Sequence, residues 1–161
     1  MLDADQPSAR TLYWGLGGAL AVFAASGLAI GLQRILRLPV GDRERFAEIA
    51  TRPWPLRLFL VMTAAGVEEL LYRGVGVGVG AALMGNIFLA SALSLVAFTA
   101  AHMRWNWWHL PSVAAAGVTL TALFLLSGDV WACVLAHFVV DALGMLVAPA
   151  MMKVRRSKQH S

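Results

Sequence analysis

Charged residues are scarce in this sequence, because Asp, Glu, Lys and Arg together make up 14% of its 161 residues. Soluble domains carry about 25%, so this chain has too few charges to cover a water-facing surface. Cysteine is nearly absent as well: Cys133 is the single one, which excludes an intramolecular disulfide and a cysteine metal cluster. A cleavable signal peptide is not expected, because the first apolar run is too long and Asp3 and Asp5 precede it.

Apolar residues are abundant instead, at 59% of the chain, and they gather in long runs. The first run carries no charge and, at about 1.5 Å per residue, spans about 33 Å, enough to cross a hydrocarbon core of about 30 Å. The sequence therefore predicts an all-α fold, a polytopic membrane helical bundle of about five transmembrane helices. The predicted helices are Thr11–Leu32, Pro55–Arg73, Ala81–His102, Leu110–Leu126 and Val130–Met151.

Glycine occupies alternate positions from Gly74 to Gly80, between the second and third predicted helices. Glycine weakens a helix, but glycines four residues apart also permit close helix packing in a membrane. We therefore expect a break, a re-entrant turn or a tight contact in this segment.

Positive charges are clustered at Arg34 to Arg57 and at Lys153 to Lys158. Short loops rich in Arg and Lys face the cytoplasm, so both clusters are expected there, with Asp129 on the opposite side. Neither cluster is tied to a soluble fold, which argues against nucleic acid as a partner.

Ionisable side chains occur inside the predicted spans, where a charge costs about 2.5–3.5 kcal/mol on insertion scales and therefore indicates a functional site. These residues are Glu68, Glu69, His102, His137 and Asp141. Three pairs are spaced four residues apart, which places both members on one helix face: Glu69 with Arg73, Phe98 with His102, and His137 with Asp141.

Three motifs follow in order: Glu68-Glu69-Leu-Leu-Tyr-Arg73, Phe98-Thr-Ala-Ala-His102 and His137-Phe-Val-Val-Asp141. They resemble the Glu-Glu-x-x-x-Arg, Phe-x-x-x-His and His-x-x-x-Asn motifs of the CAAX-protease and bacteriocin-processing family of intramembrane proteases. The resemblance covers about Arg57 to Pro149. It implies hydrolysis of peptide bonds inside a membrane, at a cavity reached from the cytosol.

The resemblance also implies roles for individual residues. Glu68 would be the general base that activates water, and His102 would help to bind or polarise this water. His137 and Asp141 would stabilise the oxyanion or bind a metal. The chemistry itself requires such groups, because water needs a base and a developing oxyanion needs a donor or a cation in a low-dielectric cavity.

Position 141 departs from the family pattern, because Asp141 stands where the family most often has Asn. An ionised Asp beside an oxyanion would repel it, so Asp141 is either protonated or has another role. Together, Glu68, His102, His137 and Asp141 are sensible ligands for a divalent metal such as zinc, and metal dependence stays open. An inactive copy of the enzyme is also compatible with this departure.

The favoured hypothesis is an intramembrane endopeptidase in which Glu69 and Arg73 form a supporting ion pair. The first alternative is a catalytically inactive member of the same fold that acts as an immunity or scaffold protein. The second is a small ion-coupled transporter, which is disfavoured because the chain shows no inverted repeat.

The chain is expected to divide into an N-terminal helix with an Arg-rich loop (1–56), a catalytic helical core (57–152) and a basic cytoplasmic tail (153–161). An integral protein of a bacterial plasma membrane is implied. Its expected partners are membrane lipid and a protein or peptide substrate, and an oligomer is compatible with the sequence.

Overall fold

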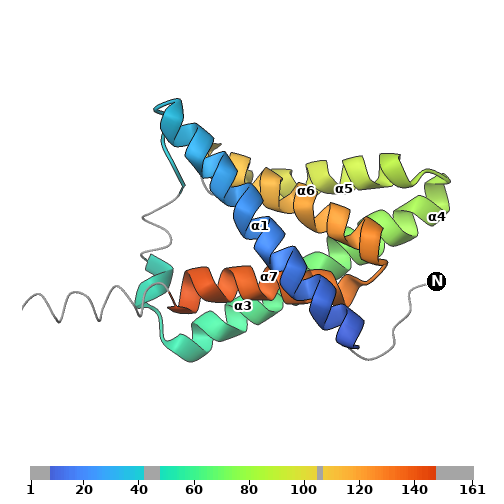
Figure 1. The fold of residues 1–161 in the computed structure, drawn as a ribbon, viewed down its shortest axis with the longest axis horizontal. Helices are drawn as coiled ribbons and strands as arrows, with labels where there is room; N and C mark the ends of the chain where they lie inside the picture. The colour runs from blue at the N-terminus through green and yellow to red at the C-terminus, as the bar shows by residue number, and fades with distance from the viewer. Residues whose placement is uncertain (1–7, 42–47, 105–106, 148–161) are drawn as a thin grey trace, which may run out of the picture.

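The computed structural model describes residues 8–41, 48–104 and 107–147 (Figure 1). Every regular element in these ranges is helical, which confirms the predicted all-α fold. The main elements are α1 (Ala9–Ile35), α3 (Trp54–Glu69), η1 (Leu70–Val79), α4 (Gly80–Met84), α5 (Ile87–Ala101), α6 (Leu110–Ser127), α7 (Val130–Ala142) and η4 (Leu143–Val147). Two short 3₁₀ turns, η2 (His102–Arg104) and η3 (Trp107–His109), follow α5.

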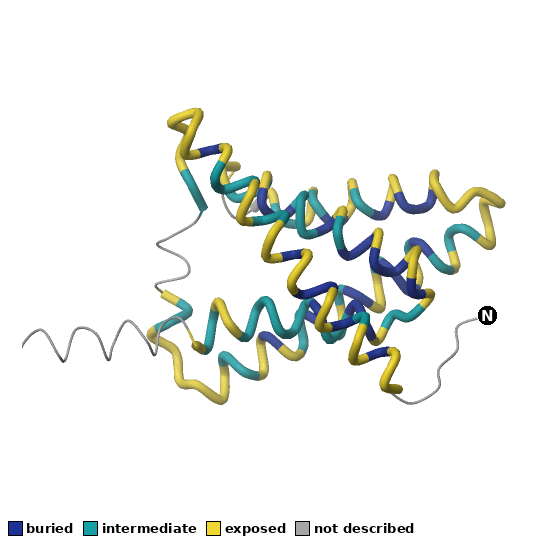
Figure 2. The backbone as a smooth tube through the Cα atoms, viewed as in Figure 1, coloured by how far each residue is buried: buried dark blue, intermediate teal, exposed yellow. Residues whose placement is uncertain are grey.

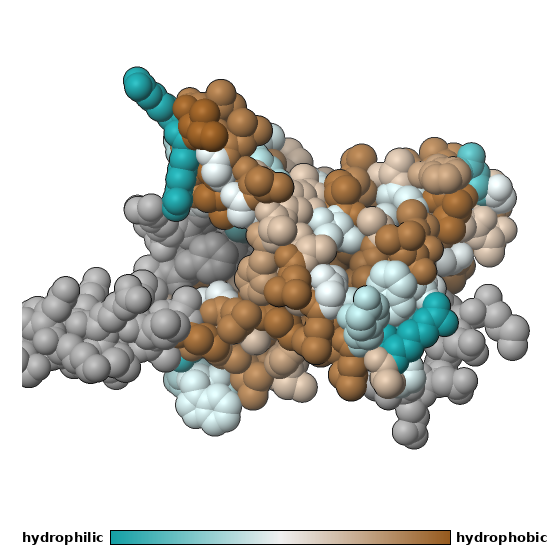
Figure 3. Space-filling model, in the orientation of Figure 1, coloured by the Kyte–Doolittle hydropathy of each residue, from teal (hydrophilic) through white to brown (hydrophobic). Residues whose placement is uncertain are grey.

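Three helices are long and apolar enough to cross a membrane: Ala9–Ile35, Trp107–Ser127 and Val130–Val147. α5 is a shorter apolar helix, and α3, η1 and α4 follow one another without a break in helical structure. Large apolar side chains are widely exposed, and Figure 3 shows a broad hydrophobic belt between the hydrophilic ends of α1. The chain is therefore a polytopic helical membrane bundle, as predicted.

The glycine-rich segment continues the helix, because η1 has the wider hydrogen-bonding pattern of a π-helix from Leu70 to Val79. Of the three outcomes expected here, the structure contains the tight contact. A Cβ atom added at Gly76 would lie 2.7 Å from Ser94 Oγ, and that hydroxyl donates a 2.6 Å hydrogen bond to the Tyr72 carbonyl. The glycine thus lets α5 approach the backbone of η1 closely.

The chain turns later than predicted, at Gly85, which has a φ of 64° and ends α4 in the left-handed conformation that glycine adopts without strain. Asn86 then caps α5 by accepting from the amides of Phe88 and Leu89. Our predicted start of this helix at Ala81 is therefore wrong, because residues 81–84 belong to the preceding helix. The predicted end of the last helix at Met151 and the basic tail lie outside the described residues.

α1 crosses α6 and α7 at the centre of the bundle, where buried residues concentrate (Figure 2). Gly15 contacts Leu135, and Gly18 contacts Leu123. At the start of α1, Thr11 donates a 2.6 Å hydrogen bond to Asp129, which joins this end of α1 to the α6–α7 turn. From there α1 and α7 diverge (Figure 1).

Candidate active site

A fully buried ion pair anchors the site on the helix formed by α3 and η1. Arg73 Nη1 donates to Glu69 Oε1 at 2.8 Å, and the two side chains are 1% and 0% exposed. Arg73 Nη2 also donates to the Gly117 carbonyl at 2.9 Å, and the guanidinium lies 4.7 Å from the centre of the Phe98 ring. The pair predicted from the four-residue spacing is thus present, and it connects η1 to both α5 and α6.

Gly117 makes this arrangement possible. A Cβ atom at this position would lie 2.8 Å from Leu95 Cδ1 and 2.9 Å from Phe98 Cδ1. Only glycine lets α6 come this close to α5, and this approach brings its carbonyl within reach of Arg73. The same carbonyl also accepts from Thr121 Oγ1 at 2.8 Å.

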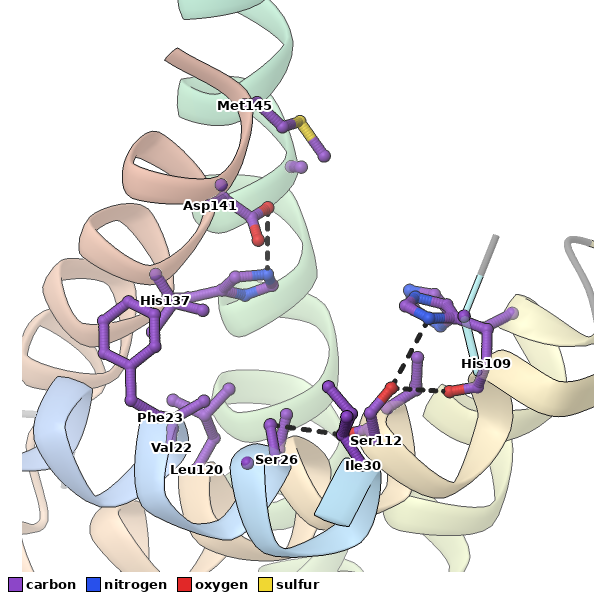
Figure 4. A pocket seen from close by; sticks show the side chains of 18 of the residues that line it. Val22, Phe23, Ser26, Ile30, His109, Ser112, Leu120, His137, Asp141 and Met145 are labelled. Carbon is purple, nitrogen blue, oxygen red and sulfur yellow. Dashed lines mark hydrogen bonds and ion pairs between the residues drawn. The ribbon is translucent and has the colours of Figure 1, made fainter. Parts of the chain in front are cut away.

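His137 lies between two carboxylates. Its Nδ1 and Glu69 Oε1 are 2.8 Å apart, and its Nε2 lies 3.5 Å from Asp141 Oδ2 (Figure 4). Because an ionised carboxylate can only accept, Nδ1 is the donor toward Glu69. The contact with Asp141 matches the predicted spacing. The contact with Glu69 was missed, because these residues are 68 positions apart and no local sequence signal joins them.

His102 faces Glu68, with 4.0 Å between His102 Nε2 and Glu68 Oε2. Its Nδ1 lies 2.8 Å from the Phe98 carbonyl, and the two rings are 4.8 Å apart. A carbonyl can only accept, so Nδ1 carries the proton in this hydrogen bond. The hydrogen bond to the last turn of α5 thus holds the His102 ring, and Nε2 points toward the Glu68 carboxylate.

The four residues implied as catalytic all line one pocket of about 550 Å³. Glu68 comes from α3, His102 from the turn after α5, and His137 and Asp141 from α7. The structure thus brings together the four residues that the sequence separates by up to 73 positions. The opposite walls are mainly apolar and come from α1 and α6: Val22, Phe23, Ile30, Val113, Ala116 and Leu120. Figure 4 shows His137 and Asp141 across the pocket from Val22, Ser26 and Ile30.

The two adjacent glutamates have different partners. Glu69 contacts Arg73 and His137, whereas Glu68 keeps 28% of its side chain exposed. Among the described residues, the buried Oε2 atom of Glu68 has no hydrogen-bond partner, and neither does that of Glu69. Glu68 is thus a partly exposed carboxylate that lines the pocket, whereas Glu69 is enclosed by its two partners.

The metal hypothesis finds no support in this geometry. Within residues 8–41, 48–104 and 107–147, no group of three or more His, Cys, Asp or Glu side chains is arranged to hold one ion. Of the four proposed ligands, His137 has both ring nitrogens directed at carboxylates.

A family profile matches residues 50–143, which is more than half of the chain and includes every motif residue described above. The profile is described as type II CAAX prenyl endopeptidase Rce1-like. No curated protein and no solved structure matches significantly. α1 lies outside the matched region. The helical membrane bundle, the order of the three motifs and this match agree, and the chain belongs to the Rce1-like family of type II CAAX prenyl endopeptidases.

Proposed function

We propose that this protein is an intramembrane endopeptidase that hydrolyses a peptide bond of a membrane-embedded or membrane-associated protein, with Glu68 as the general base. The observation that carries this proposal is the difference between the two glutamates. Glu69 is fully buried and paired with Arg73 and His137, whereas Glu68 faces the pocket beside His102. A base must reach its substrate proton, and of the two glutamates it is Glu68 that lines the pocket.

The spacing of Glu68 and His102 suits a bound water molecule. With 4.0 Å between Glu68 Oε2 and His102 Nε2, one water can lie about 2.8 Å from both atoms. Because His102 Nδ1 donates to the Phe98 carbonyl, Nε2 is the ring nitrogen directed toward this water. The Glu68 carboxylate and His102 Nε2 can therefore both hydrogen-bond to this water and orient it.

In the reaction, Glu68 takes a proton from the water while the water oxygen bonds to the carbonyl carbon of the substrate. The carbonyl electrons move onto its oxygen, which becomes an oxyanion. When this tetrahedral intermediate collapses, the carbon–nitrogen bond breaks and the proton passes from Glu68 to the leaving nitrogen. The immediate products are a carboxylic acid and an amine, the acid then passes its proton to the amine or to solvent to become a carboxylate, and Glu68 is returned to its starting state.

His137 is the proposed donor to the oxyanion through Nε2, because Nδ1 is held by Glu69 at 2.8 Å whereas the 3.5 Å distance from Nε2 to Asp141 is long for a hydrogen bond. Asp141 supports this donor. Asp141 Oδ2 lies 3.5 Å from His137 Nε2, so its charge acts first on the imidazole ring. This geometry favours a positioning role for Asp141 over direct contact with the oxyanion, which an ionised carboxylate would repel. A donor beside the developing negative charge is most effective in an enclosed site of low dielectric constant.

Glu69 and Arg73 are proposed to hold this machinery in place. Their ion pair fixes His137 through Glu69 and fixes α6 through the Gly117 carbonyl. The pocket reaches Arg34 in the last turn of α1. Because arginines near helix ends favour the cytoplasmic side, we place the mouth of the pocket toward the cytosol and the catalytic core within residues 57–152.

The experiment is cleavage of a reporter with one apolar span, reconstituted with the protein in liposomes. We expect cleavage by the wild type and a loss of about a thousandfold or more in Glu68→Gln, because removal of a general base costs about 10²–10⁴ in rate. Glu48→Gln is the control, since Glu48 is exposed and is not among the residues that line the pocket. Cleavage by Glu68→Gln at the wild-type rate would overturn Glu68 as the general base, and absence of cleavage by the wild type would leave the fold with a non-catalytic role.

A further inference from the structure

α1 turns one continuous face toward the pocket, although it lies outside the region that the family profile matches. The pocket-lining residues of this helix are Val22, Phe23, Ser26, Gly27, Ile30 and Arg34. Steps of three and four residues follow the helical repeat, so these positions form one stripe. From the first to the last of them the stripe is about 18 Å long, at about 1.5 Å per residue.

The middle of this stripe is a notch. Gly27 lies one turn after Phe23 and one turn before Ile30, so two large apolar side chains flank a position without a side chain. A Cβ atom added at Gly27 would have no other atom within 4 Å. The notch is thus open space, unlike Gly15 and Gly18 on the same helix, where α1 packs directly against Leu135 and Leu123.

Hydrogen bonds hold α1 against its neighbours on both sides of the notch. Before it, Ser26 Oγ donates to the Ser112 carbonyl of α6 at 3.4 Å. Beyond it, the buried Gln33 side chain donates through Nε2 to the carbonyls of Trp108 at 2.8 Å and Pro39 at 3.2 Å. The wall is therefore fixed in place before any ligand arrives, and a preformed wall can select among ligands by shape.

We propose that the Gly27 notch is the specificity subsite of this enzyme and receives a bulky apolar side chain of the substrate peptide. This inference rests on the proposed function, because the polar cluster in the same pocket must hold the scissile bond. Across from the notch, α6 contributes Val113, Ala116 and Leu120, so a side chain that enters between α1 and α6 meets apolar surface. On the pocket-lining stripe of α1, every described position except 27 carries a side chain, so Gly27 is where this stripe leaves room for such a group.

The test is Gly27→Leu, which fills the notch from a Cβ that has no other atom within 4 Å. Gly17→Leu is the matched control: Gly17 lies on α1, is exposed, has no other atom within 4 Å of an added Cβ, and lies off the described lining of the pocket. The probes are quenched fluorescent peptides with an apolar Ala/Leu segment, in which Phe replaces each position in turn. The readout is the ratio of kcat/KM for each Phe peptide to that of the unsubstituted peptide.

In the wild type and Gly17→Leu, we expect one Phe position, at a fixed distance from the cleaved bond, to raise this ratio. Gly27→Leu should lower the ratio at that position by about tenfold or more, the scale on which apolar pockets discriminate side-chain size. An unchanged ratio in Gly27→Leu would overturn the subsite.

A second readout separates this inference from the proposed function. Binding of the same peptides, by fluorescence anisotropy, is measured in the Glu68→Gln background, where catalysis is not required. A preference for the Phe peptide that Gly27→Leu removes supports the subsite even if no protein cleaves. Equal binding of all peptides by both proteins would overturn the subsite while leaving any observed cleavage intact.

Discussion

Glu68 and Glu69 follow one another in α3, yet one faces a pocket and the other is sealed inside the bundle. The Glu69 side chain is 0% exposed and contacts Arg73 and His137, each at 2.8 Å. The Glu68 side chain is 28% exposed, and its Oε2 atom lies 4.0 Å from His102 Nε2. Successive helix residues point about 100° apart, so one side chain reaches the core while its neighbour reaches the pocket.

The difference between these two carboxylates separates structure from chemistry. A carboxylate held by two close partners fixes the positions of those partners, whereas a carboxylate that faces open space can accept a proton from a substrate. The Glu48–Arg52 pair provides a reference, because it has the same four-residue spacing and a similar distance of 3.1 Å but is largely exposed. Spacing alone therefore does not decide what a Glu–Arg pair contributes.

The largest effect on stability should come from Glu69→Gln. This change leaves the charge of Arg73 buried without a compensating carboxylate, and breaking a buried pair in this way costs about 3–5 kcal/mol. Glu48→Gln, which breaks the exposed pair, should cost about 0.5 kcal/mol. Unfolding in mixed micelles measures both. Equal losses in the two variants would remove the distinction between the buried and the exposed pair.

His102→Asn should produce the next largest effect, and it should act on activity alone. The Asn amide nitrogen can replace Nδ1 in the hydrogen bond to the Phe98 carbonyl, but nothing replaces Nε2 beside Glu68. We expect kcat/KM on the membrane reporter to fall about 10²-fold, as for other acid–base groups. Thermal stability should change little, and a large loss of stability would indicate that His102 is mainly structural.

Gly117→Ala tests the packing beneath Arg73. The added methyl group meets Leu95 and Phe98 at less than 3 Å, so α5 and α6 must move apart, and such overpacking costs about 1–3 kcal/mol. Gly31→Ala is the control, because nothing lies within 4 Å of a Cβ there and alanine favours a helix. A Gly117→Ala variant as stable as Gly31→Ala would show that this close approach is not needed.

Asp141→Asn should have the smallest effect. The Asn side chain can still orient His137, and the motif most often has Asn at this position. We expect kcat/KM within about tenfold of the wild type, whereas Asp141→Ala, which removes the 3.5 Å contact with His137 Nε2, should lower kcat/KM by about tenfold or more, or about 1.5 kcal/mol. Kinetics of the two variants on one reporter make the comparison. Inactivity of Asp141→Asn with full activity of Asp141→Ala would contradict a positioning role.

Local patterns in the sequence were sufficient for the helical fold class and for the contacts between residues four positions apart, because both depend on the helical repeat alone. The Glu69–Arg73 pair is an example. The contact of His137 with Glu69 depends on how α7 packs against α3, and no local pattern encodes it. Likewise, glycine at 74–80 indicated a weak helix, but packing against Ser94 keeps this segment helical as η1. The wall contributed by α1 became visible only in the folded chain.

Chemical rescue tests the division between Glu68 and Glu69 most directly. Glu68→Ala removes the carboxylate from an open pocket of about 550 Å³, so added formate can enter and take its place as base. Glu69→Ala removes a carboxylate from a site that is 0% exposed, where formate has no path. We expect formate to restore cleavage of the liposome reporter by Glu68→Ala in a saturable manner and to leave Glu69→Ala unchanged. Wild-type cleavage by Glu68→Ala without formate, or rescue of Glu69→Ala alone, would contradict the assignment of Glu68 as the base.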